Sequence, residues 1–394
     1  MFNKKGKKNI HLDFAATTPV DKKVLKKMKK YFSDSFFNPS SIYFEAKKIK
    51  GLISQYRIEI ARKFQIKDSE IIFTNGGTES INIAILGIAK KYPDSQIISL
   101  KTEHPAVLES LKEAERLGVD VKLLDVNEDG VVSVEDVKKV LNEKTSLVTI
   151  SYATNEIGAI QPIQKISREI LKYKEEKSSG NESFPFFHTD ASQAGLLLDL
   201  NINGLKVDLL TLDGSKIYGP KASGCLIKKN YVELDSIMFG GGQEQGLRPG
   251  TENVSGIVGF CEALLLVFEN REEDLRHFEI LQKYMFDMIL KEIPESKLNG
   301  NLKNRMKNNL NFCVQGLNSE FAVIMMDELG INCSAMTACK SLKGNGQSYA
   351  IGALGDTGCA GSSVRFSFGR KTTKKEIDKA VRAFRKTVDF QMKK

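Results

Sequence analysis

The chain of 394 residues contains no tryptophan, and no uninterrupted apolar run is longer than that at residues 263–268. A membrane-spanning helix needs about 20 mostly apolar residues, so no span is predicted. The first ten residues are rich in lysine but lack the arginines of a transit peptide, and no apolar core of the kind found in secretory leaders follows them. We therefore expect a cytoplasmic protein that makes no membrane contact.

The six cysteines also lack a pattern. They stand at positions 225, 261, 313, 333, 339 and 359, and no two of them form a C-x-x-C pair. Structural zinc sites need such close spacings, and disulfide frameworks belong mainly to small secreted chains. The sequence therefore predicts a reducing cytosol and no metal site.

The composition is that of an ordinary globular protein, with 41% hydrophobic and 27% charged residues. The length suggests two or three domain-sized units. The formal net charge is +9, and lysines cluster at positions 26, 27, 29 and 30. Such a run usually marks a solvated helix face, and the alternative is an electrostatic surface for an acidic protein or RNA.

Short apolar strands alternate with helical segments over the first two thirds of the chain. Strands are expected at 71–74, 97–100, 119–126, 146–153, 184–190, 208–212 and 224–229, and helices at 79–91, 106–117 and 134–141. This alternation favours an α/β fold with a mostly parallel sheet flanked by helices. The polar stretch 174–183 is expected to be a surface loop.

After about residue 259 the pattern changes. A long helical stretch at 261–293 leads to an alternating strand at 308–314, which suggests a small α+β domain. We expect a large domain at 16–262 and a small domain formed by 1–15 and 263–394.

Three motifs follow expected strands. Gly76-Gly77-Thr78-Glu79 opens a helix, where backbone N–H groups can hold a phosphate, although a plain strand-to-helix turn has the same pattern. Asp190 ends a strand and would face the crevice of an α/β sheet, or cap a helix. Lys216 follows the next strand and is either a surface lysine or one held for Schiff-base chemistry. Together a phosphate cradle, an acid and a lysine are the parts of a pyridoxal-phosphate site.

With these motifs, the chain resembles the cysteine desulfurases of the class V aminotransferase family, which have the fold-type-I architecture. The resemblance runs from residue 11 to residue 370. Its segments include HLDFAATTP, NPSSIY, FTNGGTES, TEHPAV, TNEIGAIQPI, HTDASQA, GSKIYGPK, FGGGQEQGLRPGTENV, TACKS and SSVRFSFGR.

The resemblance implies pyridoxal 5'-phosphate as the cofactor and gives roles to matching residues. Lys216 would be the Schiff-base lysine, and Asp190 would pair with the pyridinium nitrogen. Gln193 would hydrogen-bond the ring hydroxyl, and His104 would stack on the ring and relay protons.

Other matching residues would hold the phosphate and the substrate. Gly77, Thr78 and Ser215 would bind the phosphate. Thr251 would reach the phosphate of a neighbouring subunit, which implies a homodimer. Asn155 and Arg365 would hold the carboxylate of L-cysteine, since arginine presents a planar, bidentate fork. Asn155 would also contact the cofactor.

Cys339 lies in the TACKS segment and would be the nucleophile that takes sulfur from L-cysteine as a persulfide, with Lys340 favouring its thiolate. A buried structural thiol is the alternative. The resemblance implies release of L-alanine and transfer of sulfur to an acceptor protein in iron–sulfur cluster assembly or tRNA thiolation. Direct binding of nucleic acid is not expected.

Three residues depart from the family pattern. Asp213 stands where the family usually has serine, Ser215 where it has histidine, and Met336 where it has glycine. A carboxylate at 213 would repel the cofactor phosphate, so Asp213 would turn away, meet a nearby cation or be protonated in place. We expect it to turn away and to weaken cofactor retention moderately without abolishing it. Three alternatives stay open. Two are enzymes of the same fold, a selenocysteine lyase and another class V aminotransferase-family enzyme. The third is an RNA- or partner-binding protein that has kept the fold without catalysis, which Asp213 and the basic charge motivate.

Overall fold

The computed structural model describes residues 9–177, 184–335, 347–355 and 357–392. Its largest element is a seven-stranded sheet with the strand order β2-β8-β7-β6-β5-β3-β4. Within it β8 runs in the direction opposite to the other six strands, so the sheet is mostly parallel, as expected. The strands are β2 (Ile71–Thr74), β3 (Gln96–Leu100), β4 (Asp120–Leu124), β5 (Thr145–Thr149), β6 (Phe186–Asp190), β7 (Leu209–Asp213) and β8 (Gly224–Lys228).

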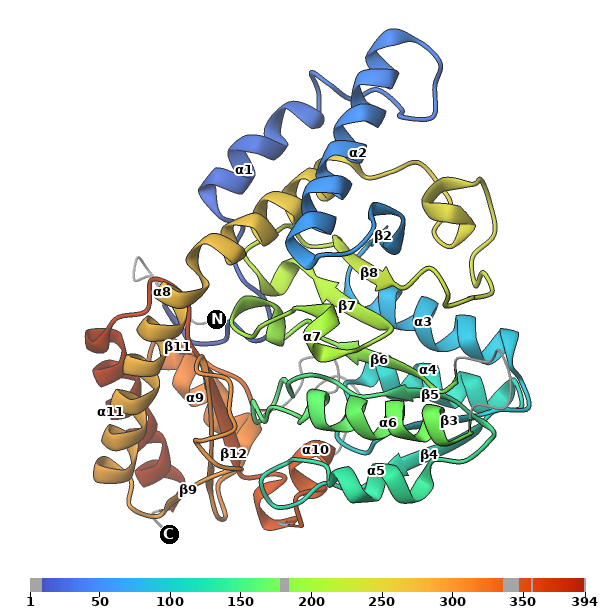
Figure 1. Cartoon of the computed structure of the whole chain (residues 1–394). Coiled ribbons are helices and arrows are strands. Elements are labelled where there is room, and N and C mark those ends of the chain that lie inside the picture. Colours follow the sequence, from blue (N-terminus) through green and yellow to red (C-terminus); the bar gives the residue numbers. More distant parts are fainter. Residues whose placement is uncertain (1–8, 178–183, 336–346, 356, 393–394) are drawn as a thin grey trace.

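Helices cover both faces of this sheet (Figure 1). Successive side chains of a strand point to opposite faces, and the core follows that alternation. Ile97 of β3 belongs to the apolar cluster formed with α3 (Gly77–Lys91) and α4 (Pro105–Arg116). Ile98 belongs to the cluster formed with α6 (Ile163–Lys177) and α8 (Val254–Glu292). The helices of this part are α1 (Lys22–Met28), α2 (Phe44–Phe64), α3 (Gly77–Lys91), α4 (Pro105–Arg116), α5 (Val134–Val140), α6 (Ile163–Lys177) and α7 (Ile202–Leu205).

Two smaller sheets lie beyond the long helix α8 (Val254–Glu292). One is antiparallel, with the order β12-β10-β9, and the other pairs β1 with β11 in parallel. Figure 1 shows α8 extending from α1 and α2 to the small sheets, where it packs against α11. The remaining elements are β1 (Ile10–His11), β9 (Ser296–Leu298), β10 (Asn309–Val314), β11 (Ile331–Asn332), β12 (Ser363–Ser367), α9 (Ser319–Glu328), α10 (Tyr349–Gly352) and α11 (Lys374–Met392).

The expected strands and helices occur within four residues of their expected bounds, except that the helical stretch expected at 261–293 begins seven residues earlier, at Val254. The polar stretch at 174–183 differs, because α6 continues to Lys177 before the described part is interrupted. The lysines at 26, 27, 29 and 30 are exposed, as a solvated helix face requires. In the described part of the chain no helix is long and apolar enough to cross a membrane.

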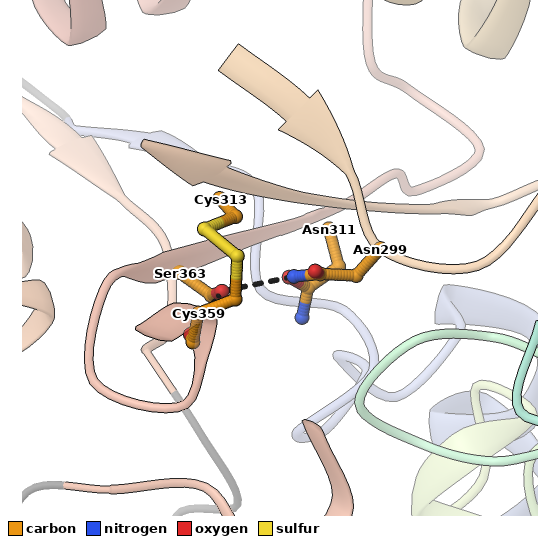
Figure 2. Close-up of a disulfide and its surroundings, with 5 residues drawn as sticks. All are labelled: Asn299, Asn311, Cys313, Cys359 and Ser363. Atoms are coloured by element: carbon orange, nitrogen blue, oxygen red, sulfur yellow. Dashed lines mark hydrogen bonds between the residues drawn. A yellow bond between two sulfur atoms is a disulfide. The ribbon is translucent and has the colours of Figure 1, made fainter. Parts of the chain in front are cut away.

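The expectation that the cysteines lack a disulfide is wrong for one pair. Cys313 of β10 is bonded to Cys359, which precedes β12, and the two stand 46 positions apart in the chain (Figure 2). Asn299 donates to the side chains of Asn311 and Ser363 beside this bond. Because β10 pairs with β12, the fold brings the two sulfurs together in a way that their spacing in the sequence does not reveal.

Candidate active site

A pocket of about 210 Å³ opens at the carboxyl ends of β6 and β7, the edge of an α/β sheet where ligands usually bind. Its wall combines the N-terminal segment, the start of α3, the end of β6 and one residue of β12. The lining residues are Ala15, Ala16, Gly77, Thr78, Ile81, Thr102, His104, Ser151, Ala153, Thr154, Asn155, Asp190, Ser192, Gln193, Asp213, Lys216 and Arg365.

Lys216 lies on the short 3-10 helix Gly214–Lys216 that follows β7. Its Nζ donates to the carbonyl oxygens of Ala15 at 3.2 Å and Ala16 at 2.5 Å. Burial lowers the pKa of Lys216, and the nearby carboxylate of Asp213 opposes that shift. A buried amine with a lowered pKa releases its proton more easily than a surface lysine, which nucleophilic chemistry requires.

Asp190 ends β6, the strand beside β7. Its Oδ1 accepts hydrogen bonds from the backbone N–H of Ser192 at 2.9 Å and from the Ser192 hydroxyl at 2.6 Å. Burial raises the pKa of the Asp190 carboxyl, while these two hydrogen bonds oppose the rise. The acid is thus held in one orientation in the pocket that Lys216 lines.

His104 is the N-cap residue of α4, and its Nδ1 accepts a hydrogen bond from the backbone N–H of Ala106 at 3.1 Å. A ring nitrogen that accepts cannot carry a proton, so the neutral ring carries its proton on Nε2. Burial lowers the pKa of His104, which favours this neutral form. The capping contact therefore fixes both the tautomer and the ring position.

Asp213 does not turn away from the start of α3, so the expectation for this residue is wrong. Its Oδ2 accepts a hydrogen bond from the backbone N–H of Gly77 at 3.1 Å. Its Oδ1 accepts from the backbone N–H and the hydroxyl of Ser215, both at 2.7 Å. The carboxylate thus uses the donors expected to bind a phosphate, because the positive end of a helix attracts any nearby anion.

Arg365 of β12 is almost completely buried and reaches across to the N-terminal segment. Its Nη2 lies 2.6 Å from Oδ1 of Asp13, and its Nη1 donates to the carbonyl oxygen of Asn155 at 2.9 Å. Its Nε is buried and has no hydrogen-bond partner among the described residues. Such a donor is costly to leave unmet, which suggests a ligand that accepts from it.

The other expected residues divide into three groups. Thr78, Gln193 and Asn155 line the pocket, with Gln193 also donating to the Ala15 carbonyl at 3.0 Å. Ser215 and Thr251 are not among the lining residues, and Thr251 is exposed. Cys339 and Met336 lie outside the described residues.

Several residues at the site have contacts that the sequence did not predict. These are Asp13, Thr102, Glu103, Ser151 and Ser192. Glu103 is buried beside His104, accepts from the backbone N–H of Ser151 at 2.8 Å, and has its pKa raised to about 7 by burial. All five fall within or next to segments that carry the family resemblance. Asp13 and Glu103 have partners distant in the chain, whereas Ser192 is bonded to Asp190, two positions away.

The donor set fits pyridoxal phosphate, with one exception. The pocket offers an amine for an aldehyde, a carboxyl for a ring nitrogen and a helix N-terminus for a phosphate. Buried polar atoms without partners in the described part include Thr102 Oγ1 and Arg365 Nε, which lie in this lining. The exception is Asp213, whose carboxylate occupies the backbone donor at the start of α3 that a phosphate would use.

Comparison with known proteins agrees with this chemistry. The family model for class-V aminotransferases matches residues 10–380. A cysteine desulfurase IscS of Clostridium botulinum is 38% identical over 377 residues, which cover 94% of this chain and 92% of the relative. A putative cysteine desulfurase IscS 1 of Bacillus subtilis is 37% identical, over a match that covers 95% of this chain and 97% of the relative.

Solved structures resemble the chain over nearly its whole length. A NifS-like protein superposes with a TM-score of 0.88 at 28% identity, covering 97% of this chain and 100% of its own. A structure of SspA in complex with cysteine superposes with a TM-score of 0.77 at 32% identity, covering 91% of this chain and 98% of its own. The chain therefore belongs to the class V aminotransferase family, as one of its pyridoxal-phosphate-dependent cysteine desulfurases.

Proposed function

We propose that the chain removes sulfur from L-cysteine in the pocket at the ends of β6 and β7 and takes it onto Cys339. The observation that carries this proposal is that Lys216, Asp190, His104 and Arg365 line one pocket although they come from four separate segments. The net reaction converts L-cysteine and the Cys339 thiol into L-alanine and a Cys339 persulfide. One carbon–sulfur bond breaks and one sulfur–sulfur bond forms, and no external oxidant is needed.

Each pocket residue has a role that its surroundings support. When bound, pyridoxal phosphate supplies a ring that accepts electrons from the substrate carbon. Lys216 would hold its aldehyde carbon and then move the α-proton of L-cysteine, because burial has lowered the pKa of this amine. Asp190 would face the ring nitrogen, and Gln193 the ring hydroxyl.

The remaining groups would orient the substrate and the phosphate. His104 would lie against the ring and donate its Nε2 proton, since Nδ1 is engaged with Ala106. Arg365 would bind the substrate carboxylate together with Asn155, and its unpartnered Nε supports this role. Gly77, Thr78 and Ser215 would contribute phosphate donors, although Gly77 and Ser215 both donate to Asp213.

The domain boundaries remain part of the proposal. A large domain at 16–262 would carry the cofactor groups, and a small domain of 1–15 and 263–394 would carry the Cys339 loop. The pairing of β1 with β11 supports placing the N-terminal residues in the small domain. Arg365 would then reach the pocket from the small domain.

We also propose that the active species is a homodimer in which Thr251 serves the partner's pocket. The loops that carry Ser40 and Gln243 support this proposal. The Gln243 side chain donates to the Ser40 hydroxyl, and exposed apolar side chains flank both loops. Among these Ile42 is 87% exposed and Phe239 is 79% exposed. Large apolar side chains gathered on a surface usually mark a protein interface.

The dimer is tested by light scattering and by mixing variants. The molecular mass in solution should be about twice the 43.9 kDa of one chain. Ile42→Arg should lower it toward the mass of a single chain. Lys216→Ala and Thr251→Ala subunits mixed after dissociation should regain activity, because one pocket of the mixed dimer has both residues. A wild-type mass of one chain, or no regain on mixing, would contradict the proposal.

Two further parts of the proposal concern the acceptor of the sulfur and the cellular compartment of the protein. The persulfide would pass to an acceptor protein in iron–sulfur cluster assembly or tRNA thiolation, and the net charge of +9 suits an acidic partner. A cytoplasmic location agrees with the unbonded thiols of Cys225, Cys261 and Cys333, whereas the Cys313–Cys359 bond does not favour it.

An absorption spectrum followed by a turnover assay tests the catalytic proposal. Purified protein supplied with pyridoxal phosphate should be yellow and should release alanine from L-cysteine. Lys216→Ala should lose both the colour and the turnover, whereas the exposed control Lys221→Ala should keep both. Turnover by Lys216→Ala would refute the role of this lysine, and a colourless wild-type protein would favour the binding-protein alternative. Parallel assays with selenocysteine distinguish a selenocysteine lyase.

A further inference from the structure

The contacts of Asp213 carry an inference about cofactor selection that rests on the proposed function. Both carboxylate oxygens are engaged, one with Gly77 and the other with Ser215. A methyl group built on Gly76 or on Gly77 would stand 3.3 Å from Oδ2 of Asp213. The carboxylate therefore lies directly against the bare backbone at the start of α3.

The start of α3 is the part of the pocket best suited to an anion. The 15-residue helix presents its unpaired N–H groups there, and its dipole adds a partial positive charge. A phosphate would use these same groups, as phosphates at helix N-termini generally do. Because Asp213 is covalently part of the chain, it competes for them at a high and constant local concentration.

The charges around Asp213 show which ligands its own charge would affect. Lys216 and Arg365 are the cationic groups of the lining, and Arg365 is paired with Asp13. Asp190 is a second carboxylate, held by Ser192. With Asp213 added, the carboxylates of the lining offset its cations, so no formal net positive charge faces a dianionic phosphate, whereas an uncharged ligand is little affected.

We propose that Asp213 is a specificity-determining residue that opposes the cofactor phosphate, so that this chain prefers pyridoxal phosphate over pyridoxal less than it would with a neutral residue at 213. Pyridoxal has the same ring and aldehyde but no phosphate. It therefore reports every effect of Asp213 on Lys216 and on the fold, while omitting the repulsion between carboxylate and phosphate. The ratio of the two affinities isolates the proposed effect.

The experiment measures dissociation constants of pyridoxal phosphate and pyridoxal for the full-length protein freed of cofactor. Visible absorbance and titration calorimetry report binding without any need for turnover. The variants are Asp213→Ser, which introduces the residue usual in the family, and Asp213→Asn, which keeps the shape and one acceptor oxygen. The control is Asp125→Asn, which removes a charge from an exposed residue paired with Lys101.

Asp213→Ser and Asp213→Asn should each tighten pyridoxal phosphate by about tenfold or more at low salt, while pyridoxal changes less than about twofold. Added salt should shrink the gain, because ions screen the repulsion. Asp125→Asn should alter neither affinity.

Three results would overturn the proposal. Equal tightening of both ligands would mean that Asp213 acts through Lys216, and unchanged affinities would mean that it exerts no repulsion. Weaker binding of pyridoxal phosphate alone would make Asp213 a supporting ligand. Each of these outcomes leaves the proposed function standing, whereas absence of the coloured complex in every variant and with both ligands would contradict the proposed function as well.

Discussion

Arg365 joins Asp13, at the other end of the chain, to the candidate pocket. The ion pair at 2.6 Å spans 352 positions of sequence, and the other end of the same guanidinium donates to the backbone of Asn155. This buried arginine is therefore held in place before any substrate arrives, which lowers the cost of orienting it during binding.

Substitution of Arg365 by lysine tests its proposed role in substrate binding. Arg365→Lys should raise the KM for L-cysteine by about tenfold or more, because an ammonium group cannot replace a bidentate fork. The cofactor colour should persist. Steady-state kinetics checks this, with Arg276→Lys on the exposed face of α8 as the control. An unchanged KM would remove Arg365 from the substrate site.

His188 makes stability depend on pH. The ring is fully buried between the hydroxyls of Thr149 at 2.8 Å and Thr211 at 3.0 Å, and burial lowers its pKa to about 3. The unfolded chain, with a pKa of about 6.5 for histidine, binds a proton that the folded chain does not. Stability is therefore lost as pH falls from about 6.5 toward about 3.

A comparison with His188→Gln isolates this effect. Glutamine can keep polar contacts but does not titrate, so the free energy of unfolding of wild type relative to the variant should fall by about 2 kcal/mol between pH 7.5 and pH 5. Denaturant titrations at the two pH values measure it. A difference that stays constant with pH would mean that His188 does not titrate in this way.

The bond between Cys313 and Cys359 should stabilise the small sheets. It closes a loop of 46 positions, for which the chain-entropy model gives about 4 kcal/mol, although measured values are often smaller. The double variant Cys313→Ser/Cys359→Ser should melt at a lower temperature than the oxidised wild type. A reductant should lower the melting temperature of the wild type alone. Equal melting temperatures of the double variant and the oxidised wild type would contradict the bond. Alkylation of both Cys313 and Cys359 in the untreated protein would contradict it as well.

The sequence predicts the sheet well because its strands are short apolar runs bounded by helices with clear periodicity, as at 71–74 and 97–100. Lys216 and Asp190 could be placed at one edge because parallel strands end together. The contact between Gly77 and Asp213 could not be predicted, since its partners are 136 positions apart and the attraction of the α3 N-terminus for a carboxylate competes with the repulsion from a phosphate. The disulfide could not be predicted either, because its two cysteines stand 46 positions apart in the chain.

The central claim is that sulfur from L-cysteine is transferred to Cys339, a residue outside the described part of the structure. Mass spectrometry of the protein after brief treatment with L-cysteine and alkylation tests it most directly. We predict a peptide heavier by one sulfur atom at Cys339, and its absence in Cys339→Ser, which should stay yellow because cofactor binding and sulfur capture use different residues. Added sulfur on Cys333 or Cys359, or on Cys339→Ser protein, would contradict the account.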